Sequence, residues 1–241
     1  MTLPVDSRPP VVGCFVKTGS PNLVEALGGT PLDFVLIDQQ HAATGDETVE
    51  SLVRAADVAG LAAIVRVPNH DPGNVNGILD AGADGLVIPQ VETGETVTAI
   101  ADAASYDGSR SFAMSTRAGR FGARDADEYL EWANDEILLV PQIESERGVA
   151  NAAEIASHSD VDCLLVGPSD LALSLDTSKG SDRHRSAIDD AYEAATSAEC
   201  GVGTVVGSES ALERERERST LLVYSTDIGI VSGRLNEVLS Q

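Results

Sequence analysis

The chain has 241 residues, of which 39 are acidic and 16 are basic, and its formal net charge is −23. So large a negative charge repels phosphate backbones and anionic membranes at long range, and we therefore expect neither a nucleic acid nor a membrane as a partner. Only two of the basic residues, Lys17 and Lys179, are lysines. Abundant carboxylates with few lysines are typical of proteins that stay soluble in concentrated salt, which predicts a halophilic protein.

Short apolar runs alternate with longer amphipathic segments along the chain. The apolar runs, which we interpret as strands, are VVGCFVK (11–17), FVLIDQQ (34–40), AAIVRVP (62–68), GLVIPQ (85–90), ILLVPQIE (137–144), DCLLVGPSD (162–170), GVGTVVG (201–207) and LLVYSTD (221–227). The segments that predict helices are 21–27, 48–60, 74–82, 93–106, 147–159, 185–199, 208–219 and 228–240. The strands are apolar nearly throughout, as in a parallel sheet that is buried on both faces.

Eight strand–helix repeats in a chain of this length predict an α/β fold with a single (β/α)8 barrel over residues 1–241, since such barrels have about 250 residues. A doubly wound open sheet is the alternative, but no glycine-rich dinucleotide loop follows the first strand. The arginine-rich segment 107–136 and the polar segment 171–184 interrupt the repeat. We place both on the catalytic face of the barrel and expect them to face the substrate.

The cysteines and the first residues of the chain bear on its compartment. Cys14, Cys163 and Cys200 are widely spaced without a C-x-x-C pair, which predicts neither a disulfide framework nor a zinc knuckle. The start, MTLPVDSRPPVV, lacks the basic residues and the long apolar stretch of a secretory signal. No apolar run approaches the roughly 18 residues of a membrane-spanning helix. We therefore expect a cytoplasmic protein.

Polar side chains gather where the predicted strands end, which is where a (β/α)8 barrel carries its catalytic groups. Glu144 and Asp170 end neighbouring strands, and two carboxylates with water or substrate oxygens suit Mg²⁺ or Mn²⁺, although each could instead cap a helix. His41 follows the second strand close to Asp38, and an imidazole beside a carboxylate can act as a general base. Arg66 ends the third strand and can stabilise an enolate, pair with Asp38, or do both.

Four segments in this order resemble the HpcH/HpaI family of metal-dependent (class II) pyruvate aldolases: FVLIDQQHA, VRVPNHDP, LLVPQIES followed by GV, and VDCLLVGPSDLA. The family includes aldolases for 2-keto-3-deoxy sugar acids and for 4-hydroxy-2-oxoheptanedioate. The resemblance runs from about Gly13 to the last predicted helix. It implies reversible retro-aldol cleavage of a 4-hydroxy-2-oxo acid to pyruvate and an aldehyde. It also implies a homo-oligomer, for which we expect a hexamer.

The resemblance further implies how metal and substrate are held. Glu144 and Asp170 would ligate the divalent metal, which is Mg²⁺ or Mn²⁺, with Co²⁺ as a further option. Pyruvate would chelate that metal through its carboxylate and keto oxygens. Gln142 and the backbone N–H groups of Ser169 and Asp170, in the turn that begins at Gly167, would hold the pyruvate.

The resemblance assigns the remaining roles to groups around the predicted mouth of the barrel. Arg66 would stabilise the enolate oxygen and His41 would act as the base. The carboxylate that raises the basicity of the histidine corresponds to Asp80, in ILDAG. Asp80 ends a helix on the face opposite the mouth, so we expect it to serve only from a neighbouring subunit. One departure is the usual D-x-E-H, which here begins at Asp38 and has Gln40 in place of the glutamate, a change that bears on metal affinity or substrate preference.

Three other functions remain open. A Schiff-base aldolase needs a desolvated lysine, but Lys17 only ends a strand and Lys179 lies in a polar loop. A carbon–carbon lyase for an acyl-CoA thioester, of the malyl- or citramalyl-CoA type, would favour a longer chain with a basic surface for the CoA phosphates. A non-catalytic barrel is compatible with Gln40, but the other retained site residues argue against it.

Overall fold

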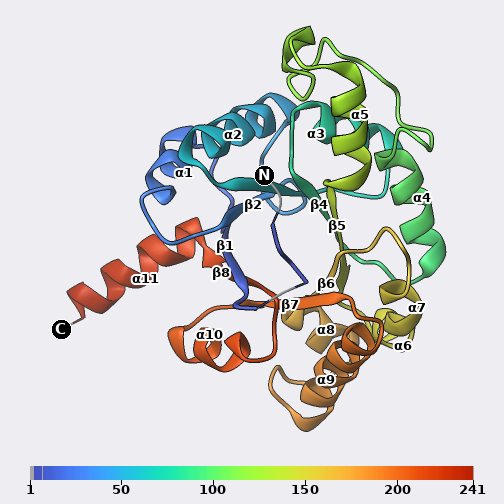
Figure 1. Ribbon diagram of the computed structural model, residues 1–241. Coiled ribbons are helices and arrows are strands. Elements are labelled where there is room, and N and C mark those ends of the chain that lie inside the picture. Colours follow the sequence, from blue (N-terminus) through green and yellow to red (C-terminus); the bar gives the residue numbers. More distant parts are fainter. Residues whose placement is uncertain (1–2, 7, 241) are drawn as a thin grey trace.

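Eight parallel strands close into a barrel within the residues that the computed structural model describes, 3–6 and 8–240. Each strand is hydrogen-bonded to the next, and β8 pairs with β1 (Figure 1). The strands are β1 (Val11–Val16), β2 (Phe34–Asp38), β3 (Ala62–Arg66), β4 (Gly85–Ile88), β5 (Leu138–Ile143), β6 (Cys163–Val166), β7 (Gly201–Val206) and β8 (Leu221–Thr226). The predicted (β/α)8 barrel is therefore confirmed.

Helices surround the barrel, as the alternating pattern predicted (Figure 1). Those of the described chain are α1 (Pro21–Leu27), α2 (Asp46–Ala59), α3 (Pro72–Asp80), α4 (Gly94–Ala104), the 3-10 helix η1 (Arg120–Gly122), α5 (Ala126–Asp135), α6 (Glu146–Ala150), α7 (Ala152–Ala156), α8 (Pro168–Ser174), α9 (Asp182–Ser197), α10 (Glu209–Arg216) and α11 (Asp227–Leu239). The polar segment 171–184, which we expected to be a loop, is helical at both ends, because α8 extends to Ser174 and α9 begins at Asp182; that expectation holds only for 175–181. None of these described helices is long and apolar enough to cross a membrane.

Apolar side chains pack on both faces of the barrel wall. Phe34 and Leu36 belong to a buried cluster that fills the barrel, whereas Val35 and Ile37, which alternate with them along β2, belong to the cluster under the helices. Every residue of β2 is buried. This double burial explains why the strands lack a polar face. Since all strands run in the same direction, the polar residues that follow them meet at one rim, the carboxyl-terminal mouth of the barrel.

The arginine-rich segment 107–136 lies at the end of the barrel opposite the mouth. It follows helix α4 rather than a strand, and its arginines contact the ends of other helices. Arg117 donates to Asp57 in α2 at 2.8 Å, and Arg110 donates to Asp80 at the end of α3 at 3.3 Å. The expectation that this segment faces the substrate of its own barrel was therefore wrong. Barrel helices run back from the mouth, so a segment inserted after a helix emerges at the far end.

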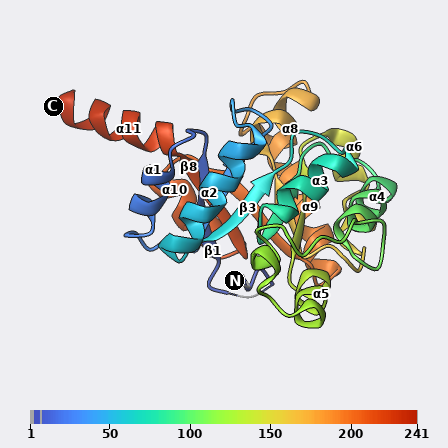
Figure 2. The same ribbon diagram turned by 90° about the horizontal axis from the view of Figure 1, so that it is seen from above.

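Helix α11 points away from the barrel in both views (Figures 1 and 2). Asp227, its first residue, is its only buried one, and residues 230–240 are all exposed. The Asp227 carboxylate accepts hydrogen bonds from the backbone N–H groups of Lys17 and Thr18, at 3.1 and 3.0 Å. This contact joins the ends of β8 and β1 at the mouth and anchors the helix by its first turn alone.

Candidate active site

A cavity of about 280 Å³ opens at the mouth of the barrel. Six of the nine predicted site residues line it: His41, Arg66, Gln142, Gly167, Ser169 and Asp170. Asp38 and Glu144 are buried and are hydrogen-bonded to residues of this lining. The tertiary structure thus gathers eight of the nine in one place, from the ends of β2, β3, β5 and β6.

Asp38, fully buried at the end of β2, is the centre of an ion cluster. Arg66 donates to it through two nitrogens, Nε at 3.0 Å and Nη2 at 2.8 Å, and Nζ of Lys17 lies 3.0 Å from its Oδ2. Burial by itself would raise the pKa of Asp38, but the hydrogen bonds and charge of Arg66, with the hydrogen bonds of Lys17 and the His41 backbone, outweigh it and lower that pKa to about 2. The carboxylate is therefore ionised at neutral pH, and it fixes the Arg66 guanidinium beside the cavity. The ring of Phe15 supports the same guanidinium, 4.7 Å away.

His41 is exposed at the mouth and contacts Asp38 only through its backbone. The backbone N–H of His41 donates to Oδ1 of Asp38 at 3.2 Å, and the backbone N–H of Gln40 donates to the same oxygen at 3.1 Å. A pairing of this carboxylate with the imidazole is not formed, because Arg66 and Lys17 take both carboxylate oxygens. The imidazole is therefore left to face the cavity and whatever the cavity holds.

Glu144, buried at the end of β5, is held on both of its oxygens. Oε1 accepts the backbone N–H of Gln90 at 2.8 Å, and Oε2 accepts Nε2 of Gln142 at 2.5 Å. Burial raises the pKa of Glu144, the Gln90 hydrogen bond opposes this, the charge of Asp170 raises the pKa further, and Arg66 lowers it. The net effect is a raised pKa, which a further positive charge near this carboxylate would lower. Oε1 of Gln142 is buried with no hydrogen-bond partner in the described protein, which leaves an oxygen available to a ligand.

Gly167 allows the turn after β6 to lie directly against these groups. A Cβ atom at this position would lie 2.7 Å from Nε2 of Gln142 and 2.9 Å from Oε2 of Glu144. Ser169 and Asp170 follow in the first turn of α8, where backbone N–H groups have no partner within the helix. The turn after β6 thus presents the backbone N–H groups of Ser169 and Asp170, and the carboxylate of Asp170, to the cavity.

The oxygen atoms around the mouth fit a hard divalent cation. Across residues 3–6 and 8–240, no three histidine, cysteine, aspartate or glutamate side chains cluster as a metal site. The charge of Asp170 does act on Glu144, so these two carboxylates are near each other. With the unpartnered Oε1 of Gln142 beside them, they could hold a cation whose other ligands come from substrate and water.

Asp80 does not reach the mouth of its own barrel. It ends α3 at the opposite face and pairs with the buried Arg110. Burial raises the pKa of Asp80, while the charge and hydrogen bond of Arg110 lower it, and the net effect is a raised pKa. Its catalytic role therefore stays a prediction that requires a neighbouring subunit.

Both lysines of the chain, which the residue pattern singled out only for Schiff-base chemistry, line the cavity. Lys17 could have been expected there, because it follows β1 as the other site residues follow their strands. Lys179 lies in the loop between α8 and α9, and only the fold of that loop brings it to the mouth.

Comparison with known proteins identifies the family. Residues 11–225 match the model of the family described as HpcH/HpaI aldolase/citrate lyase. The chain belongs to this family. The hydroxypyruvate/pyruvate aldolase of Paraburkholderia phytofirmans (strain DSM 17436 / LMG 22146 / PsJN) is 37% identical over 186 residues, which cover 72% of this chain and 71% of that protein.

Two further proteins are similar to this chain. The 5-keto-4-deoxy-D-glucarate aldolase of Shigella boydii serotype 18 is 35% identical over 166 residues, 68% of this chain and 64% of that protein. The chain thus matches slightly less than two thirds of the length of that relative. The crystal structure of an HpcH/HpaI aldolase/citrate lyase family protein from Burkholderia cenocepacia J2315 superposes with a TM-score of 0.92 at 33% identity, covering 96% of this chain and 93% of that one.

Proposed function

We propose that this protein is a divalent-metal-dependent aldolase that reversibly cleaves a 4-hydroxy-2-oxo acid of the 2-keto-3-deoxy sugar acid type into pyruvate and an aldehyde. The observation that carries the proposal is the convergence of Arg66, Gln142, Asp170 and His41 on one cavity, with Glu144 directly behind it. Membership in the HpcH/HpaI family and the activities for which the two aldolase relatives are named support the same reaction.

Each group of the cavity has a distinct task in this proposal. Glu144 and Asp170 hold a divalent cation, which when bound supplies the Lewis acidity that lowers the cost of removing a proton next to a carbonyl group. Gln142 and the free N–H groups at the start of α8 orient the carboxylate of the 2-oxo acid. Arg66, fixed by Asp38, stabilises the negative charge that develops on the 2-oxo oxygen. His41 moves the proton of the hydroxyl group on the aldehyde half.

The environment of Lys17 argues against a Schiff-base mechanism. A Schiff base forms from a neutral amine, whereas the Lys17 ammonium lies 3.0 Å from the ionised Asp38. Lys17 therefore supports Asp38 electrostatically.

Solvent deuterium exchange into the methyl group of pyruvate tests the proposal, with Mg²⁺ or Mn²⁺ added and then removed by EDTA, in high salt. We expect exchange that EDTA abolishes. Exchange that survives EDTA would instead indicate a Schiff base on a lysine. No exchange under any condition would overturn the proposal and favour the acyl-CoA lyase or the non-catalytic barrel.

A matched pair of variants ties that exchange to the site. Arg66→Lys keeps the charge but loses the two-nitrogen contact with Asp38, and we expect exchange to slow by at least about tenfold. Arg54→Lys changes an exposed arginine on α2 that pairs with Glu50, and we expect it to leave the rate unchanged. Equal rates in the two variants would contradict the role given to Arg66.

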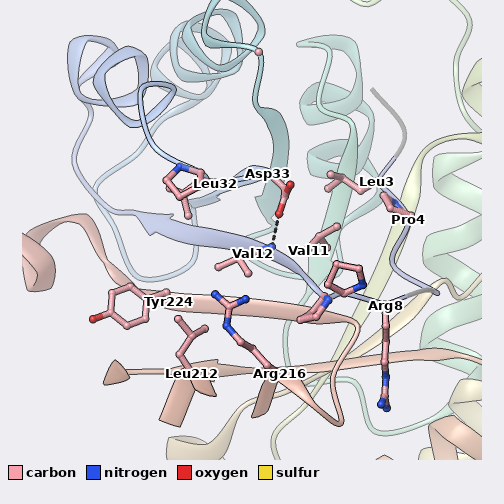
Figure 3. Close-up of a pocket in the computed structure, with 14 residues that line it drawn as sticks. Leu3, Pro4, Arg8, Val11, Val12, Leu32, Asp33, Leu212, Arg216 and Tyr224 are labelled. Atoms are coloured by element: carbon pink, nitrogen blue, oxygen red, sulfur yellow. Dashed lines mark hydrogen bonds between the residues drawn. The ribbon is translucent and has the colours of Figure 1, made fainter. Parts of the chain in front are cut away.

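We also propose that the protein is a homo-oligomer, with a hexamer as the expected assembly, and that α11 packs against a second copy. Its exposed apolar side chains recur at helical spacing: Ile228, Val231, Leu235, Val238 and Leu239. A groove of about 770 Å³ lies between the loop before β2 and helix α10, over β1 and β8, with Val12, Leu212 and Tyr224 among its lining (Figure 3). Because α11 does not cover this side of its own barrel, an α11 from another copy could bury both surfaces.

Light scattering after size-exclusion chromatography tests the assembly. We expect an oligomer for the wild type and smaller species for Leu235→Glu, which places a charge on the apolar stripe of α11. Asn236→Glu adds the same charge at the neighbouring exposed position and should leave the mass unchanged. A monomeric wild type would refute the proposed assembly and, with it, a catalytic role for Asp80.

A further inference from the structure

The chain places both of its lysines at the mouth cavity, although it has 39 acidic and only 16 basic residues. Lys17 comes from the end of β1 and is paired with Asp38 at 3.0 Å. Lys179 comes from the loop between α8 and α9, and its Nζ donates to Oγ of Ser169 at 3.2 Å. Lys179 forms no ion pair with a carboxylate of the described chain. It is therefore a cation at the cavity with no counter-ion among residues 3–6 and 8–240.

The loop that carries Lys179 is held in place by a buried histidine. Gly180 has a φ of +81°, a conformation that favours glycine, and its N–H donates to Nδ1 of His184 at 3.1 Å. Nε2 of His184 lies 2.7 Å from the carbonyl oxygen of Pro168 and donates to it. His184 therefore ties the loop to the start of α8, next to Ser169 and Asp170. The ammonium of Lys179 is thus positioned before any ligand arrives, which reduces the entropy lost on binding.

Lys179 also stands where the mouth meets a second cavity, of about 720 Å³. The two cavities share Pro168, Lys179, Val205, Val206 and Gly207. The three arginines of the second cavity are already neutralised: Arg185 by Asp182 at 2.7 Å, Arg214 by Glu215 at 3.1 Å and Arg218 by Asp189 at 2.7 Å. Lys179 is thus the one cation of this lining, within the described residues, that still lacks an acidic partner.

We propose that Lys179 is a specificity-determining residue that binds an anionic group, a carboxylate or a phosphate, on the aldehyde half of the substrate. The proposal rests on the proposed aldolase function. In that reaction the pyruvate half lies against Arg66, Gln142 and Asp170, and the rest of the substrate extends from it toward the junction of the two cavities. A negative group at that junction meets the pre-positioned ammonium. With an uncharged aldehyde, the Lys179 ammonium keeps its hydrogen bond to Ser169 and gains no ion pair with the substrate.

The test compares kcat/KM in the aldol direction for matched aldehydes. The carboxylate arm uses 4-oxobutanoate and its neutral methyl ester, and the phosphate arm uses glyceraldehyde 3-phosphate and glyceraldehyde. We expect the wild type to favour the anionic member of at least one pair, and the arm that shows the preference identifies the group. Lys179→Met should lower that preference by about 10- to 100-fold, the effect of losing a hydrogen bond to a charged group. Lys179→Arg should keep it, and Lys179→Glu should reverse it.

Arg183→Met is the matched control. Arg183 is a nearby exposed cation that pairs with Glu146 at 2.8 Å and lines neither cavity, so we expect the anionic preference to stay as in the wild type. Urea unfolding of each variant checks that it is folded. An unchanged preference in folded Lys179→Met, or no preference in the wild type, overturns the role of Lys179 while leaving metal-dependent exchange into pyruvate intact. Loss of that exchange in the wild type overturns the aldolase function and this proposal together.

Discussion

Replacing Asp38 by asparagine should remove the negative charge shared by Arg66 and Lys17 while keeping the size of the side chain. Asp38 is fully buried, and Arg66 and Lys17 contact both of its oxygens. An asparagine keeps only one acceptor oxygen, and since Arg66 donates to both carboxylate oxygens, the amide nitrogen would face a nitrogen of Arg66 in either orientation. We therefore expect Asp38→Asn to destabilise the fold and to release Arg66 from its position beside the cavity.

The size of the effect follows from the pKa of Asp38, which falls from its ordinary 3.8 to about 2. One pKa unit corresponds to about 1.4 kcal/mol, so the ionised carboxylate contributes about 2.5 kcal/mol to the free energy of unfolding at neutral pH. Because this pKa is lowered in the folded protein, the contribution is complete well above pH 3.8 and is lost as the pH falls toward 2. The difference between wild type and variant should therefore shrink in acid.

Urea unfolding at constant high salt, at pH 7 and at pH 3, measures this difference. Asp57→Asn is the control, since Asp57 is an exposed aspartate that also pairs with an arginine, Arg117, at 2.8 Å. Exposed ion pairs contribute at most about 1 kcal/mol, so this variant should stay close to the wild type. The stabilising role of the Asp38 charge is refuted if Asp38→Asn lowers the free energy of unfolding no more than Asp57→Asn at pH 7, or if it lowers it equally at both pH values.

Other substitutions probe the mouth and the backbone. Glu144→Gln should weaken Mn²⁺ binding at least about tenfold, as measured by titration calorimetry, since it removes one of two carboxylates from the site; equal affinity would exclude Glu144 as a ligand. Gly167→Ala should lower kcat, because its Cβ would lie 2.7 Å from Nε2 of Gln142, at a cost of about 1–3 kcal/mol in urea unfolding. Gly77→Ala, at an exposed helical position where the Cβ meets nothing within 4 Å, should instead stabilise by up to about 1 kcal/mol.

The residue pattern was sufficient to predict the barrel and most of the polar residues that line its mouth. Apolar runs such as 34–37 are buried on both faces of the barrel wall, and their alternation with helical segments leaves parallel strands as the arrangement. Parallel strands end at one rim, so a polar residue at a strand end is placed at the mouth whatever the packing details. Arg66, Gln142 and Asp170 were located by this rule.

The position of segment 107–136 was also implicit in the order of elements, although we expected it at the mouth. The segment follows a helix, and barrel helices end at the far rim. Its arginines therefore contact Asp57 and Asp80 rather than substrate. A connection lies at the mouth if it follows a strand and at the far end if it follows a helix. The charge of the connecting segment does not indicate at which end it lies.

Only the tertiary structure decided which side chains meet. The register of β2 against β3 places Asp38 opposite Arg66, so the carboxylate near His41 in the chain serves Arg66 and Lys17 instead. Lys179 reaches the mouth through the turn that His184 holds, and α11 turns away from the barrel although its pattern is that of a packed helix. Local sequence patterns determine which helices and strands form, because each segment has to bury its own apolar residues and satisfy its own backbone hydrogen-bonding groups. Contacts between charged groups depend on register and loop geometry, which arise only when the whole barrel closes.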